Sequence, residues 1–167
     1  MDSISCCEYI SFSEESTMQI GELMAEHSFP GLVFLLEGDL GTGKTTLVRG
    51  FCRADGYIGV RSPSFTLVNR YSCGEKTVVH SDLYRLSSVD PTELDVESYL
   101  DDRSVLFVEW ADRGVPGDFS EIWRIRFRYE DEEEDEGRRV LSFSAQGARA
   151  EKALESFLGK LKERKKK

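Results

Sequence analysis

A glycine-rich segment behind an apolar run constrains the fold of this chain more than any other feature. Residues 38–45 read Gly-Asp-Leu-Gly-Thr-Gly-Lys-Thr, which satisfies the phosphate-binding loop pattern Gly-x4-Gly-Lys-Thr. Glycines permit positive φ angles and leave no Cβ between backbone amides and an anion. Those amides form an anion site where the next helix begins. The candidate phosphate-binding residues are Gly38, Asp39, Leu40, Gly41, Thr42, Gly43, Lys44, Thr45 and Thr46.

Two residues at the end of this loop have specific expected roles. Lys44 would place its charge on the β- and γ-phosphates, and the Thr45 hydroxyl would ligate Mg²⁺. Residues 32–36 form an apolar run typical of a buried strand, and residues 45–53 put Leu47, Val48 and Phe51 on one helical face. Strand, loop and helix is the context that the pattern requires. The alternative is a glycine-rich turn before an ordinary helix.

Composition limits what the chain can do on its own. Its 167 residues suggest one domain, residues 1–167, with a sizeable core. The formal net charge of −9 makes the surface a poor stand-alone binder of nucleic acid or of an anionic membrane. The sequence has no apolar run of membrane-spanning length, and its first residues do not resemble a signal peptide. The four cysteines lack metal-ligand spacing, so we expect reduced thiols and a cytoplasmic protein.

The remaining patterns alternate between helix and strand. One helix is expected from Ser13, as N-cap, to about Glu26, another from Asp90, with Pro91 in its first turn, and a third over about residues 148–161. Strands are expected at residues 8–12, 65–71, 76–80, 104–108, 122–129 and 140–144. Hairpin signals argue against an all-parallel sheet. The fold class we predict is therefore α/β, a single P-loop NTPase-like domain with a mixed parallel and antiparallel sheet flanked by helices.

Two charged segments are expected to be solvated. The acidic run 130–137 lies between two alternating strands, so we interpret it as a hairpin tip. The basic segment 160–167 follows the last helical pattern, and we interpret it as a frayed C-terminal tail.

Two acidic residues follow apolar strands and, with Lys44, are the candidate catalytic residues. Glu109 follows residues 104–108, and Asp82 follows residues 78–81. The C-terminal end of a buried strand beside a phosphate loop is the usual metal side of such a site. Glu109 is the first choice for Mg²⁺, through water. Asp82 is the second, as a metal ligand or as a base that orients the attacking water. Either carboxylate could instead cap a nearby turn.

Other side chains near these acids are less specific candidates. Ser64 and Thr66 lie between a loop and a strand, in a segment that could close on a γ-phosphate. Trp110 follows Glu109 and could pack on a nucleotide or on the core. His80 is interpreted as a structural histidine.

Four blocks of this sequence together resemble the bacterial TsaE (YjeE) family. They are residues 38–51, 62–71 (Ser-Pro-Ser-Phe-Thr-Leu-Val-Asn-Arg-Tyr), 80–86 (His-Ser-Asp-Leu-Tyr-Arg-Leu) and 108–110 (Val-Glu-Trp). They occur in the family's order over about residues 8–145, and the second and third blocks make the match specific. Ser64 stands where the family usually has threonine, which keeps the hydroxyl. Ala111 stands where it usually has proline.

The resemblance implies a function. In that family an ATPase that uses ATP and Mg²⁺ binds the TsaB–TsaD complex and supports formation of threonylcarbamoyladenosine at position 37 of tRNAs reading ANN codons. The partners bind the tRNA, which agrees with the acidic surface here. The family's nucleotide site corresponds to the phosphate loop, residues 64–66, Asp82 and residues 109–110. The base would lie near Glu14, Gly137 and Arg138.

We therefore expect a Mg²⁺-dependent ATPase. The chain alone should hydrolyse ATP slowly, and its partners should stimulate the hydrolysis. A small-molecule kinase is one alternative, but it would need an arginine-bearing lid, and Arg61, Arg70 and Arg85 are scattered. A nucleotide-gated binding module, which binds ATP without useful hydrolysis, is another.

Overall fold

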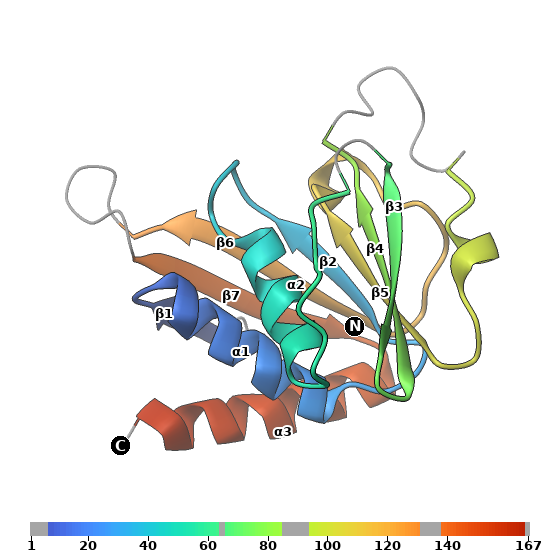
Figure 1. Cartoon of the computed structure of the whole chain (residues 1–167). Helices are drawn as coiled ribbons and strands as arrows, with labels where there is room; N and C mark the ends of the chain where they lie inside the picture. Colours follow the sequence, from blue (N-terminus) through green and yellow to red (C-terminus); the bar gives the residue numbers. More distant parts are fainter. Residues whose placement is uncertain (1–6, 64–65, 85–93, 131–137, 166–167) are drawn as a thin grey trace.

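The computed structural model of the chain describes residues 7–63, 66–84, 94–130 and 138–165. Within these residues the strands form one seven-stranded sheet (Figure 1). Its spatial order is β1 (Cys7–Ser11), β7 (Arg139–Gln146), β6 (Ile122–Tyr129), β2 (Val33–Glu37), β5 (Ser104–Glu109), β4 (Lys76–Asp82) and β3 (Val68–Cys73). The central strands β6, β2, β5 and β4 run parallel, whereas β1, β7 and β3 pair antiparallel. The mixed α/β sheet expected from the sequence is confirmed, and so are its hairpins β3–β4 and β6–β7.

Strand alternation divides the core into two layers, one on each face of the sheet. On β2, Phe34 and Leu36 face one layer, whereas Val33 and Leu35 face the other. The first layer lies under α1 (Glu14–His27), α2 (Lys44–Arg53) and α3 (Ala148–Lys165), which Figure 1 shows gathered on one side of the sheet. The second layer lies under the loops before and after β5, within residues 94–103 and 110–119. The sheet is therefore covered on both faces around β2 and β5, where the site is built.

Helices α1 and α2 contact each other backbone to backbone through glycines. A Cβ on Gly21 would lie 2.3 Å from the carbonyl oxygen of Leu47, and one on Gly50 would lie 2.1 Å from that of Met18. Arg53 on α2 also bonds Glu15 and Glu22 on α1. This packing fixes the start of α1 beside the phosphate loop.

The parallel strands bring the candidate residues to one edge. Parallel neighbours end at the same side of a sheet, and ligands of α/β folds bind there. In register, Leu36 on β2 pairs with Glu109 on β5, which in turn pairs with Asp82 on β4. The loop that follows β2 and both acids therefore lie next to one another.

Several expected boundaries shift. β3 begins at Val68, because Leu67 has a φ of 67°, which is outside the extended range. α3 continues to Lys165, so residues 160–165 of the expected tail are helical, with Leu161 buried in the core.

Two expectations fall largely outside the described residues. They are the helix expected from Asp90 and the acidic run, most of which lies in 131–137. After the gap at residues 85–93, the described chain forms a short 3₁₀ turn at Glu97–Tyr99. None of the described helices has the length and apolarity needed to cross a membrane.

Candidate nucleotide-binding site

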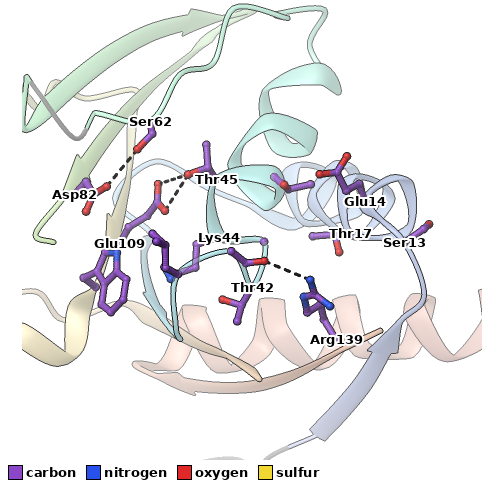
Figure 2. A pocket seen from close by; sticks show the side chains of 15 residues that line it. Ser13, Glu14, Thr17, Thr42, Lys44, Thr45, Ser62, Asp82, Glu109 and Arg139 are labelled. Carbon is purple, nitrogen blue, oxygen red and sulfur yellow. Dashed lines mark hydrogen bonds between the residues drawn. The ribbon is translucent and has the colours of Figure 1, made fainter. Parts of the chain in front are cut away.

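The loop between β2 and α2 borders a pocket of about 260 Å³. Figure 2 shows Thr45, Ser62, Asp82 and Glu109 at one end of the pocket, and Ser13, Glu14 and Arg139 at the other. The lining residues come from the start of α1, the loop and the start of α2, the segment before β3, the ends of β4 and β5 with the residue after β5, and the start of β7. They are Ser13, Glu14, Thr17, Leu40, Gly41, Thr42, Gly43, Lys44, Thr45, Thr46, Ser62, Asp82, Glu109, Trp110 and Arg139.

Two glycines of the loop are required by backbone geometry. Gly38 has a φ of 146°, and a Cβ there would lie 2.6 Å from the carbonyl oxygen of Phe127 on β6. Gly43 has a φ of 108° and directly precedes α2. No side chain among the described residues caps α2 through a hydrogen bond, so the first amides of this helix remain free to bind an anion.

Lys44 is folded back onto the loop. The residue is 4 % exposed, and its Nζ donates to the carbonyl oxygens of Gly38 (2.5 Å) and Asp39 (2.9 Å). The same atom lies 4.2 Å from the centre of the Trp110 ring. Burial lowers the pKa of Lys44 from its ordinary value, and the nearby Glu109 carboxylate opposes this shift. The amine is thus at the phosphate loop, with its donors directed at loop carbonyls.

Thr45 and Glu109 connect α2 to the end of β5. The Thr45 hydroxyl donates to both carboxylate oxygens of Glu109, at 2.9 and 3.0 Å (Figure 2). Glu109 is 3 % exposed, and its Oε2 also contacts Nε2 of His80 on β4. The hydroxyl and carboxylate predicted to bind Mg²⁺ are therefore in direct contact, 64 residues apart in sequence.

Asp82 is the second buried acid at this edge. Its Oδ1 accepts from the backbone amide of Tyr84 at 2.9 Å, and its Oδ2 accepts from the Ser62 hydroxyl at 3.3 Å. Burial raises the pKa of Asp82, the neighbouring Glu109 raises it further, and the two hydrogen bonds oppose the shift. Two carboxylates that share one partly enclosed space favour a cation between them.

The sequence left two positions open for Trp110, one at the nucleotide and one in the core, and the structure places its side chain at the border of both. It lines the pocket and also packs against the core layer under the 94–119 loops. Its φ of 60° places it in the left-handed region, which is costly for a tryptophan. Tyr84 packs on its ring at 4.8 Å between centroids, and the Arg113 guanidinium lies 5.5 Å from it.

The far end of the pocket contains Glu14, as expected, and three residues that sequence reasoning missed. Ser13 caps α1, and the Thr17 hydroxyl bonds that of Ser11 at 2.6 Å. Arg139 lies over the Tyr129 ring at 4.2 Å and donates to the carbonyl oxygen of Gly41 at 3.4 Å. Ser62, at the opposite end, was also missed. A serine or threonine in a loop or first turn carries little signal without the fold around it.

Four expected residues that the structure describes do not line the pocket, and two more lie outside the described residues. Gly38 and Asp39, at the start of the loop, accept hydrogen bonds from Lys44 through their carbonyl oxygens. Thr66 is exposed and its hydroxyl bonds Asn69 at 2.7 Å. Arg138 lies over the Phe12 ring at 5.3 Å, whereas its neighbour Arg139 lines the pocket. Ser64 and Gly137 fall outside the described residues.

The donor atoms at the acidic end match the ligands of Mg²⁺. This ion takes oxygen ligands, keeps several waters and usually binds through one or two carboxylates together with substrate phosphates. In the described part of the chain, no group of three or more His, Cys, Asp or Glu side chains is arranged to hold a metal alone. Thr45, Glu109 and Asp82 therefore fit an ion that arrives with a nucleotide better than a permanently bound one.

The fold and the glycine-rich loop define a P-loop α/β domain. A family model described as "Threonylcarbamoyl adenosine biosynthesis protein TsaE" matches residues 11–140. The chain therefore belongs to the TsaE family.

Individual relatives agree with this assignment. The chain is 39 % identical over 119 residues to a protein named "tRNA threonylcarbamoyladenosine biosynthesis protein TsaE" from Haemophilus influenzae, covering 66 % of this chain and 73 % of that protein. It is 38 % identical over 124 residues to the protein of the same name from Nostoc sp., covering 71 % and 76 %. The crystal structure of Bacillus subtilis YdiB superimposes with a TM-score of 0.72 at 29 % identity, covering 94 % of this chain and 96 % of that one.

Proposed function

We propose that this chain is a Mg²⁺-dependent ATPase that binds a TsaB–TsaD-type complex and supports threonylcarbamoyladenosine formation at position 37 of tRNAs reading ANN codons. The observation that carries the proposal is the contact between Thr45 of the phosphate loop and the buried Glu109 carboxylate. This contact joins the phosphate-binding loop to a carboxylate suited to binding Mg²⁺. Asp82 on β4 pairs in register with Glu109 on β5. Family membership supplies the pathway.

In this proposal each group at the phosphate end of the pocket has its own role. The amides at the start of α2 bind phosphate oxygens, and Lys44 exchanges its loop carbonyls for the β- and γ-phosphates. Thr45 and Glu109 hold Mg²⁺, which when bound neutralises charge on the phosphates. Asp82, with its raised pKa, orients or deprotonates the attacking water.

The other end of the pocket is proposed to receive the base. Glu14 and Arg139 line it, and the family resemblance adds Gly137 and Arg138 to this end. An arginine plane can stack on a purine ring. Trp110 would contact the nucleotide from the metal side. The segment of Ser64 and Thr66, joined to the site through Ser62 and Asp82, would close on the γ-phosphate.

Phosphate release from ATP by the purified chain tests this function. We expect slow release from the chain alone and a large increase when TsaB and TsaD from the same organism are added. Lys44→Ala should abolish ATP binding, since the loop loses its cation, and Glu109→Ala should weaken the Mg²⁺ dependence. Phosphate transfer to a small acceptor, with no effect of the partners, would indicate a kinase instead. Normal ATP binding by Lys44→Ala would show that the loop assignment is wrong.

A further inference from the structure

His80 is a buried polar side chain that the proposed roles do not use. It lies on β4 with 0 % exposure, and its Nε2 contacts Oε2 of Glu109. Its other ring nitrogen, Nδ1, is buried and has no hydrogen-bond partner among the described residues. A histidine that merely filled the core would not need a carboxylate at one nitrogen.

The surroundings of His80 determine which nitrogen carries the proton. The Glu109 carboxylate accepts from Thr45 at both of its oxygens, so an ionised carboxylate needs a donor at Nε2 as well. A proton at Nδ1 would be a buried donor without an acceptor, whereas a bare Nδ1 leaves only a lone pair unsatisfied. The arrangement therefore favours a hydrogen on Nε2 over a hydrogen on Nδ1.

His80 provides the Glu109 carboxylate with a hydrogen bond that does not involve a proposed metal ligand. Within the described residues, Thr45 and His80 are the side chains that donate to this carboxylate. Thr45 is itself a proposed metal ligand, so its hydroxyl would be shared between Glu109 and Mg²⁺ when the nucleotide binds. His80 is fixed in the sheet, in register with Phe107 two residues before Glu109.

We propose that His80 is a positioning residue whose Nε2–H holds the Glu109 carboxylate in the orientation that receives Mg²⁺. The inference rests on the proposed function, because it assigns Glu109 to the metal. It resembles the general case in which a buried partner orients a metal-binding side chain, where loss of the partner weakens metal affinity roughly 10- to 100-fold.

Two substitutions separate this role from simple packing. In His80→Gln the side-chain amide nitrogen is as many bonds from Cβ as Nε2, so the donor to Glu109 is retained. In His80→Asn the amide nitrogen corresponds to Nδ1, and the donor is lost. Ser81→Ala is the matched control. Ser81 is the next residue on β4, is equally buried, and its hydroxyl has no partner among the described residues.

The measurement is the Mg²⁺ concentration that half-saturates binding of a fluorescent ATP analogue, together with the affinity for the analogue without Mg²⁺. We expect His80→Asn to need roughly 10- to 100-fold more Mg²⁺ with an unchanged Mg²⁺-free affinity. His80→Gln and Ser81→Ala should stay close to wild type. An independent readout is the ¹⁵N NMR spectrum of the wild-type imidazole, which should show the hydrogen on Nε2.

The two possible failures are distinguishable. Wild-type binding that does not depend on Mg²⁺ would overturn the proposed function and, with it, this role of His80. A Mg²⁺-dependent wild type whose His80→Asn variant needs no additional Mg²⁺ would overturn only the inference. If His80→Asn does not fold, the spectrum and His80→Gln decide: a proton on Nδ1, or a Gln variant that loses its Mg²⁺ response, contradicts the proposal.

Discussion

At the scale of single residues, the site is composed of groups that are unfavourable in an isolated protein. Lys44 is buried and Trp110 has a left-handed backbone. Asp82 and Glu109 are buried carboxylates on neighbouring strands. Functional sites commonly carry such costs, because the groups are arranged for a ligand and not for the folded state alone.

Asp82→Asn should stabilise the protein in the absence of nucleotide and Mg²⁺. The pKa of Asp82 is raised in the fold by burial and by Glu109, so the native state keeps this proton to higher pH than the unfolded chain does. The contribution of Asp82 to the free energy of unfolding is therefore most favourable in acid and falls as the pH rises through the raised pKa. At pH 7–8 we expect a melting temperature roughly 2–4 °C higher, equivalent to about 1 kcal/mol in a domain of this size.

The matched control is Asp118→Asn, which changes an exposed carboxylate and should leave the melting temperature almost unchanged. The stabilisation by Asp82→Asn should shrink toward pH 4, and its ATP hydrolysis should fall. A lower melting temperature at pH 7–8 would contradict the account of Asp82 as a destabilising acid.

At the scale of elements, the position of α1 depends on two glycines. Gly21 and Gly50 let the backbones of α1 and α2 touch, and this contact brings the start of α1, with Ser13, Glu14 and Thr17, to the pocket.

Gly50→Ala should destabilise the protein and weaken nucleotide binding together. The added Cβ would lie 2.1 Å from the Met18 carbonyl oxygen, so α1 must move away. We expect a loss of roughly 1–3 kcal/mol or more in the free energy of unfolding, measured by urea denaturation. Gly159→Ala in α3 is the control, because its Cβ meets no atom within 4 Å. That change should be neutral or stabilising by roughly 0.5–1 kcal/mol, and equal effects of the two changes would refute the packing argument.

Individual helices, strands and hairpins could be predicted from the sequence better than the order of the strands in the sheet. The strand, loop and helix around Lys44 and the hairpin β3–β4 follow from local patterns, so both could be anticipated. The order of the parallel strands follows from packing between distant segments, and no local pattern contains it. For this reason Asp82 and Glu109 could be named from their strand ends, whereas the role of His80 required the register of β4 and β5. Arg139 was missed for a similar reason, because it is the first residue of β7 and only the pairing of that strand tells which side chain at its start faces the pocket.

At the scale of the whole molecule, charge disfavours direct binding of tRNA by this chain. The net charge is −9. The three arginines of β6 are already paired, Arg124 and Arg126 with Glu37 and Arg128 with Glu8. Nucleic-acid affinity is largely set by free basic groups that neutralise phosphates.

The isolated chain should therefore bind tRNA only weakly. In a filter-binding assay at physiological salt we expect a dissociation constant above about 100 µM, the weak end of non-specific binding. Adding TsaB and TsaD should retain this chain and tRNA on the same complex. Salt-sensitive micromolar binding by the chain alone would refute the argument from charge.

The pairing of Asp82 with Glu109 across β4 and β5 has a consequence for how this site can evolve. Their Cα separation is set by the main-chain ladder, at about 4.8 Å between adjacent strands, and not by the side chains around them. Mutations in the core can change the packing around these two carboxylates without changing the spacing of the two strands. In the proposed metal site, a shift in metal preference would therefore come from the reach of the carboxylates, by exchange of aspartate for glutamate or the reverse, because the backbone keeps the spacing of the two strands constant.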